Sequence, residues 1–110
     1  MAIATSINQS KKLIELGIDR ETADMYYWES EGKEYLYVGK CNDINGIPAW
    51  SLSALMELMP FPSLHNFFNN KWRCDIHYED GDVRKFGKDA DSPLDAAFEM
   101  MVYVLEKMIK

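Results

Sequence analysis

The chain has 110 residues, of which 47% are hydrophobic and 27% are charged, so its composition excludes disorder as the default state and its length predicts one domain over residues 1–110. Eighteen acidic against twelve basic residues give a formal net charge of −6. Because no run of lysine and arginine reaches the density that phosphate contacts need, the sequence disfavours nucleic acid as a partner. The spread of acidic residues is typical of a solvated surface, and an acidic face that meets a basic partner is the alternative.

The N-terminal segment predicts the compartment. The stretch MAIATSINQSKK is polar and lacks the apolar run of a secretory signal, and the longest apolar runs of the chain are too short to cross a bilayer. We therefore expect a cytoplasmic protein without membrane contact, in which Cys41 and Cys74 are thiols. If the protein is secreted instead, a disulfide between these two cysteines becomes the expectation.

The first predicted element is a helix over residues 6–17. Ser6 and Gln9 have the spacing of a capping box, and Gly17 suits the left-handed residue that ends a helix. Asp19 then begins a second short turn, which gives residues 13–28 a cadence similar to the DNA-binding helix-turn-helix. Because Arg20 is the single basic residue of its second part, a structural corner is favoured, and a nucleic-acid-associated protein is the alternative.

A β-hairpin follows. Residues 25–29 and 35–38 are rich in aromatic and β-branched side chains, and Glu31-Gly32-Lys33 separates them as a turn. The aromatic side chains can form core on one face and a sticky patch on the other, or a stacking platform for single-stranded nucleic acid. Without flanking basic residues the first of these interpretations is favoured.

The segment PAWSLSALMELMP (residues 48–60) predicts a short helix. Ser51 is a good N-cap, apolar residues recur at three- and four-residue steps, and Pro60 prevents continuation. A helix of about two turns is unstable alone in water. We therefore expect it to dock on a sheet beside the last helix, with Trp50 as its anchor.

Residues 72–79 and 83–86 predict a second hairpin around Asp80-Gly81. The strict alternation of residues 72–79 places Trp72, Cys74, Ile76 and Tyr78 toward the core and Arg73, Asp75, His77 and Glu79 toward solvent. An alanine at position 75 is then expected to change stability by less than about 1 kcal/mol. The two hairpins look alike, which reflects either a weak duplication or, as we favour, two hairpins that obey the same rules.

The last predicted helix begins at Ser92-Pro93, where the serine caps and the proline takes the first helical position. Its apolar stripe comprises Leu94, Phe98, Met101, Val102, Leu105 and Ile109. The apolar residues Met100, Tyr103 and Val104 remain on an adjoining face. A helix that is apolar beyond one stripe is sandwiched between other elements or meets a second subunit, and a homodimer is slightly favoured here.

Together these elements predict an α+β fold in the order helix, hairpin, helix, hairpin, helix. We expect a single antiparallel four-stranded sheet with the helices packed on one face.

No motif in the chain predicts catalysis or a cofactor. The possible metal ligands Cys41, His65, Cys74 and His77 lack the close spacing of a structural zinc site. A nucleophile pair of Cys41 and His65 is conceivable, but the chain contains no Gly-x-Ser-x-Gly, no phosphate-binding glycine loop and no His-Glu-x-x-His. The sequence therefore predicts a non-enzymatic protein without metal or cofactor.

The remaining hypothesis is a protein that acts by binding another protein or itself, through exposed apolar residues. The candidate interaction surface comprises Tyr26, Trp28, Tyr35, Tyr37, Met100, Tyr103 and Val104.

Three blocks of the sequence carry a resemblance: QSKKLIELGIDRETADM (residues 9–25), PAWSLSALMELMP (residues 48–60) and DSPLDAAFEMMVYVLE (residues 91–106). In this order and spacing they resemble small proteins from bacteriophages and prophages of Bacteroides-type gut bacteria. The resemblance covers most of the chain outside the two hairpin turns and residues 61–71. It implies a setting, namely a cytoplasmic protein of a bacterial host cell encoded by phage or other mobile-element DNA, and it implies no activity and no functional residue.

Overall fold

The structure, a computed structural model, describes residues 3–41, 45–77, 84–87 and 89–107. The helices are α1 (Ile7–Glu15), α2 (Leu52–Glu57) and α3 (Pro93–Lys107), with 3₁₀ turns η1 (Arg20–Thr22) and η2 (Phe68–Asn70). The strands are β1 (Met25–Ser30), β2 (Lys33–Val38), β3 (Ile47–Ala49), β4 (Ser63–Phe67), β5 (Lys71–His77) and β6 (Arg84–Phe86). Within these described ranges, the apolar part of each helix falls short of what spanning a bilayer requires.

The α+β class is confirmed, but the single four-stranded sheet is wrong. The strands form two antiparallel sheets of three strands each, in the orders β2-β1-β3 and β4-β5-β6. Each predicted hairpin gains a third strand, because β3 pairs with β1 and β4 pairs with β5. The second edge of each central strand is therefore occupied, and the two hairpins do not pair with each other.

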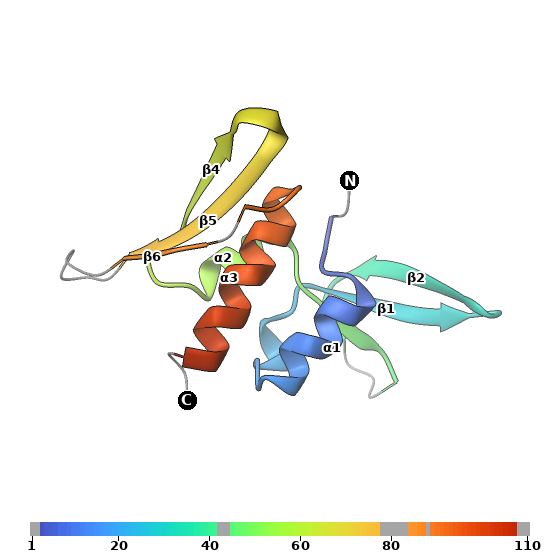
Figure 1. Cartoon of the computed structure of the whole chain (residues 1–110). Coiled ribbons are helices and arrows are strands. Elements are labelled where there is room, and N and C mark those ends of the chain that lie inside the picture. The colour runs from blue at the N-terminus through green and yellow to red at the C-terminus, as the bar shows by residue number, and fades with distance from the viewer. Residues whose placement is uncertain (1–2, 42–44, 78–83, 88, 108–110) are drawn as a thin grey trace.

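Each sheet carries its own helix, so the helices do not share one face of one sheet. The strand β3 packs against α1, and β5 packs against α3. Figure 1 shows the two sheets on opposite sides of the helices, with the β1–β2 hairpin reaching away from the rest of the chain. The molecule is accordingly elongated, with extents of 50 × 34 × 19 Å.

The predicted helix starts are confirmed. Ser6 caps α1 through a complete capping box with Gln9, and the side-chain nitrogen of Gln9 also donates to the Asp95 carboxylate at 2.9 Å. At the start of α3, the Asp95 amide donates to the hydroxyl of Ser92 at 3.1 Å. Gly17 follows α1 with φ of 95°, the left-handed conformation that ends a helix. The hydrogen bond between Gln9 and Asp95 links the first turns of α1 and α3.

The corner over residues 13–28 does not contain a second α-helix. Asp19 caps the 3₁₀ turn Arg20–Thr22, and the chain enters β1 at Met25. A helix-turn-helix reads DNA with a second helix that lies in the major groove. A 3₁₀ turn of three residues does not provide such a helix, so the geometric basis of the nucleic-acid alternative is absent from this corner.

The segment before α2 is an anchor, as expected. Trp50 has no exposed surface, and its ring nitrogen donates to the Thr22 hydroxyl at 2.9 Å. Ser51 caps α2 by accepting from the Ala54 amide at 3.2 Å, while its own hydroxyl donates to Asp24 at 2.5 Å. The helix packs against α3. Short as it is, α2 is held by its cap and by the buried tryptophan before it.

The predicted interaction surface on α3 is wrong for two of its three residues. Met100 is 1% exposed and Val104 is 3% exposed, and both belong to the main core. Tyr103 is partly buried and packs against the same core. The physical reason is that β5, α2 and α1 all contact α3. The helix is apolar beyond one stripe because it is sandwiched within one chain, not because it needs a second subunit.

The predicted alternation of buried and exposed side chains along β5 holds on the core face and fails on the face predicted to be exposed. Cys74 and Ile76 are fully buried and Trp72 is half-buried, as predicted, but Asp75 is only 4% exposed. The reason is that both neighbouring strands approach this carboxylate, with His65 of β4 at 3.2 Å and the Gly87 amide after β6 also at 3.2 Å. Tyr78, Glu79 and the Asp80-Gly81 turn lie outside the described residues.

Candidate protein-interaction face

The first hairpin begins at a two-residue turn whose geometry fixes its register. Glu31 and Gly32 have φ of 52° and 77°, and positive φ at both positions is the signature of a type I′ turn. This turn matches the natural twist of the flanking strands and places Ser30 opposite Lys33. Every later pair of the hairpin follows from that starting point.

This register gathers four aromatic side chains on one face of the hairpin. Tyr26 lies opposite Tyr37, and Trp28 lies opposite Tyr35. Because side chains alternate along a strand, residues two apart share a face, so all four lie together. We call Tyr26, Trp28, Tyr35 and Tyr37 the aromatic face. These are the four hairpin residues of the candidate interaction surface named from the sequence.

The aromatic face is ordered but open to solvent. The rings of Tyr26 and Tyr37 stack with centroids 5.4 Å apart and an interplanar angle of 21°. Tyr35 and Tyr37 remain 46% and 42% exposed, while Tyr26 and Trp28 are half-buried. Stacked cross-strand rings stabilise the hairpin and are held in place. The result is a partly exposed aromatic surface made of three tyrosines and one tryptophan.

The opposite face of the hairpin anchors it to the body of the molecule. Met25 is buried with Ala4 and Ala49, and Tyr27 and Leu36 pack against them. The Tyr27 hydroxyl donates to the carbonyl of Thr5 at 2.9 Å. Burial, and then the charge of Glu34, raise the pKa of the Tyr27 hydroxyl. One face of the hairpin therefore packs against the body of the molecule, and the aromatic face belongs to neither core cluster.

The strand β2 is also an edge of its sheet, because the strand order is β2-β1-β3. Its Val38 is 83% exposed. Among the described residues, six large hydrophobic side chains are exposed, and three of them, Tyr35, Tyr37 and Val38, lie on this one strand. The sequence reading missed Val38, because its exposure follows from the strand order and the hairpin pattern alone does not give that order. Of the seven predicted residues, the structure brings together the four on the hairpin and separates the three on α3 from them.

A polar cluster lies on the second sheet. The Ser63 hydroxyl is 3.2 Å from His65 Nε2 and 3.3 Å from His77 Nε2, and His65 Nε2 is also 3.2 Å from the Asp75 carboxylate. A Ser-His-Asp relay needs the serine and the acid on different ring nitrogens of the histidine. Here both contacts use Nε2 of His65, so this set does not form a relay.

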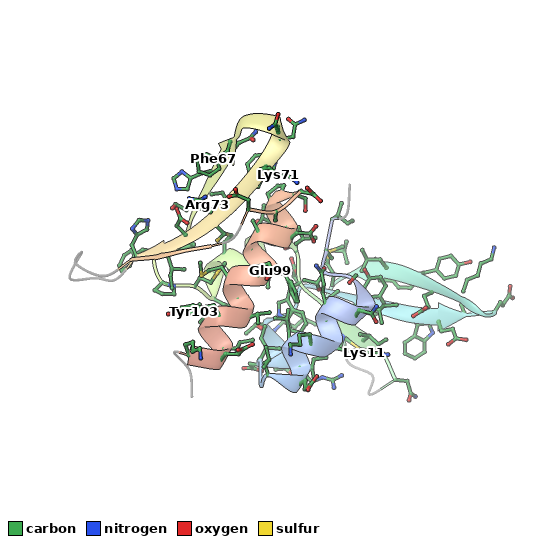
Figure 2. All side chains as sticks on the ribbon, viewed as in Figure 1. Lys11, Phe67, Lys71, Arg73, Glu99 and Tyr103 are labelled. Atoms are coloured by element: carbon green, nitrogen blue, oxygen red, sulfur yellow. The ribbon has the colours of Figure 1, made fainter. Side chains whose placement is uncertain are left out.

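The basic side chains of β5 contact an aromatic ring of β4 and carboxylates that follow β6. The Arg73 guanidinium lies 4.7 Å from the centroid of the Phe67 ring, and its Nε and Nη2 donate to Asp89 at 3.1 and 2.9 Å. Figure 2 shows Phe67 and Arg73 side by side on β4 and β5. Lys71 forms an ion pair with Asp91. Lys71 and Arg73 of β5 thus both have carboxylate partners inside the chain.

Of the two cysteines, Cys41 and Cys74, the environment of Cys74 disfavours a thiolate. Both are thiols, and burial, reinforced by the Asp75 charge, raises the pKa of Cys74 to about 11. A thiol with that pKa stays protonated near neutral pH, whereas nucleophilic cysteines have lowered pKa values. Cys41 follows β2 in the first sheet and His65 lies on β4 in the second. Among the residues that the structure describes, no group of three histidine, cysteine or acidic side chains could hold a metal ion.

The burial of Asp75 leads to a prediction opposite to the one from the sequence. Replacing Asp75 with alanine removes the acceptor of the Gly87 amide and the partner of His65. The half-buried Gly87 amide then lacks its acceptor, so we expect Asp75→Ala to lower the free energy of unfolding by about 1 to 2 kcal/mol. Urea denaturation followed by circular dichroism measures it. Glu29→Ala, at an exposed strand position, is the control and should change the value by less than about 0.5 kcal/mol.

Comparison with known proteins adds no further constraint on this assignment, because no family model, curated protein or solved structure matches the chain.

Proposed function

We propose that the chain is a non-enzymatic accessory protein of phage or prophage origin that acts in the bacterial cytoplasm by protein–protein interaction, with the aromatic face as its contact surface. The observation that carries this proposal is the pairing of four aromatic side chains on one hairpin face, two of them more than 40% exposed. The origin and the compartment rest on the three sequence blocks and the polar N-terminal segment.

The composition of the face supports a protein partner. Tyrosine and tryptophan are enriched in protein interfaces, because they provide a large contact area with few rotatable bonds. Ordering the face on binding costs little, since Tyr26 and Tyr37 are already stacked. A single-stranded nucleic acid would need cations beside the rings, and Lys33 is the only basic residue of β1 and β2.

Site-specific cross-linking tests this proposal. A photoreactive benzoylphenylalanine at position 35 should form adducts with protein, either in the purified chain or in lysate of a Bacteroides-type host. The matched control carries the same group in place of Phe67, which is 43% exposed on the other sheet against 46% for Tyr35. Adducts from position 35 that disappear when Tyr37 is changed to serine support the aromatic face.

Two results would contradict the proposal. Equal adduct yields from positions 35 and 67 would mean that cross-linking follows exposure alone. A lack of adducts from position 35 in both samples would mean that the aromatic face has no protein partner there. Because both positions are exposed, neither label is expected to disturb the core.

A further inference from the structure

We propose that the occupant of the aromatic face and its edge is a second copy of this chain, whose β2 pairs antiparallel with β2 across a two-fold axis. This inference rests on the proposed function and names its partner. Two-fold dimers are the commonest symmetric assemblies of small proteins, and an exposed strand edge is a template for pairing with another chain.

The hairpin geometry identifies which backbone groups of β2 are available. In a two-residue hairpin the pair that flanks the turn, here Ser30 and Lys33, is hydrogen-bonded, and bonded and non-bonded pairs then alternate. The amides and carbonyls of Lys33, Tyr35 and Tyr37 therefore point toward β1. Those of Glu34, Leu36 and Val38 point away from it. Within the described residues, no strand pairs with this outer side of β2.

This edge has few of the features that normally prevent pairing. Edge strands are commonly protected by proline, by a bulge or by several charged side chains. The pairing of β1 with β2 is continuous over six residue pairs, and β2 contains no proline. Its two charged residues, Lys33 and Glu34, both lie at the end next to the turn. The half that contains Leu36, Tyr37 and Val38 carries no charge.

Symmetry and backbone bonding select one register. Paired residues must share a face of the sheet, and a two-fold axis pairs one residue with its own copy. If the axis passes through Leu36, Leu36 pairs with its own copy and Glu34 pairs with Val38 of the second copy. The backbone groups of all three outward-facing residues of each strand then form hydrogen bonds. A centre at Tyr35 leaves Val38 opposite the turn. A centre at Glu34 places two carboxylates directly opposite each other, which is destabilising.

The chosen register also matches the side chains. It places Tyr35 opposite Tyr37 of the second copy, twice by symmetry, and aromatic cross-strand pairs are stabilising. The two aromatic faces then become continuous across a sheet of six strands. Val38, which is 83% exposed in the single chain, lies opposite the Glu34 of the other copy. The stem of that glutamate covers part of the valine, while its carboxylate stays in solvent.

The contact between position 38 and Glu34 provides a sharp test. We compare Val38→Glu with Val38→Lys at a position whose side chain is almost fully exposed, so both variants should keep the circular dichroism spectrum and unfolding midpoint of the wild type. The glutamate creates two like-charge pairs and the lysine creates two opposite-charge pairs. Their dimer dissociation constants should differ by roughly tenfold or more at low salt, with the lysine variant the tighter.

Sedimentation equilibrium measures these constants. A strand-edge contact is small, so the loading range should extend from about 5 to about 500 µM. Wild-type dimers with the expected order of the two variants support the proposal. Dimers with equal constants for both variants would overturn it, because position 38 then does not meet Glu34.

A wild type that stays at 12.8 kDa over this range would also overturn the second copy as the partner. Cross-linking from position 35 then separates the two proposals. If position 35 still forms adducts with another protein in host lysate, the proposed function stands and only the dimer fails. If those adducts are also missing, both proposals fail.

Discussion

Replacing Trp50 with alanine should lower the free energy of unfolding by about 3 to 5 kcal/mol, which is a large part of the total stability of a domain of this size. Trp50 has no exposed surface, and its removal leaves a cavity where α2 meets the main core. The substitution also deprives the Thr22 hydroxyl of its donor. Urea denaturation followed by far-ultraviolet circular dichroism gives the value.

Trp50→Phe is the matched control for this variant. It keeps a six-membered aromatic ring but removes the five-membered part of the indole, including the nitrogen that donates to Thr22. We therefore expect it to cost roughly 1 to 3 kcal/mol, clearly less than the alanine substitution. If Trp50→Ala unfolded at the same urea concentration as the wild type, Trp50 would not be the anchor of this segment.

The second large effect concerns Ile76. Ile76→Asp should lower the free energy of unfolding by more than about 4 kcal/mol, because it buries a carboxyl group among apolar side chains without a hydrogen-bond or ionic partner. Ile76 is fully buried in the main core, in the middle strand of the second sheet. Loss of the cooperative thermal transition, followed by circular dichroism, is the expected observation.

Ile76→Val is the control, and its expected cost is about 1 kcal/mol, because it removes one methylene group from the same place. A thermal transition of Ile76→Asp close to that of Ile76→Val would mean that this side chain faces solvent, and the assignment of the buried side of β5 would then be wrong. Asp75→Ala is unsuitable as the neutral comparison, because Asp75 is itself buried.

The features that the sequence predicted correctly depend on neighbours along the chain. Ser6, Ser51 and Ser92 each accept a hydrogen bond from an amide three residues on, and Glu31-Gly32 closes a hairpin between residues that are adjacent in the chain. Such contacts need no knowledge of the rest of the fold. The grouping of the four aromatic residues belongs to the same class, since it follows from a period of two and the turn.

The features that the sequence did not predict depend on distant partners. β3 has three residues and includes Pro48, and β4 follows two prolines, so neither has the length or composition of a strand by itself. Both exist because a neighbouring strand is present to pair with them. Asp75 is buried by groups from β4 and from the residue after β6, and Met100 by contacts from several elements. Hydrophobic periodicity predicts which face of a strand or helix is apolar. It does not predict which other elements pack against either face.

The separation between the two faces of the β1–β2 hairpin has a consequence for how this protein can diversify. Met25 and Leu36 hold the hairpin to the body, while Tyr35 and Tyr37 on the other face make no contribution to either core cluster. Substitutions at these two tyrosines should therefore leave both core clusters intact, and they should cost the fold only their cross-strand contacts with Trp28 and Tyr26. A lineage of such proteins can exchange one recognition specificity for another in a few mutational steps, while its scaffold remains unchanged.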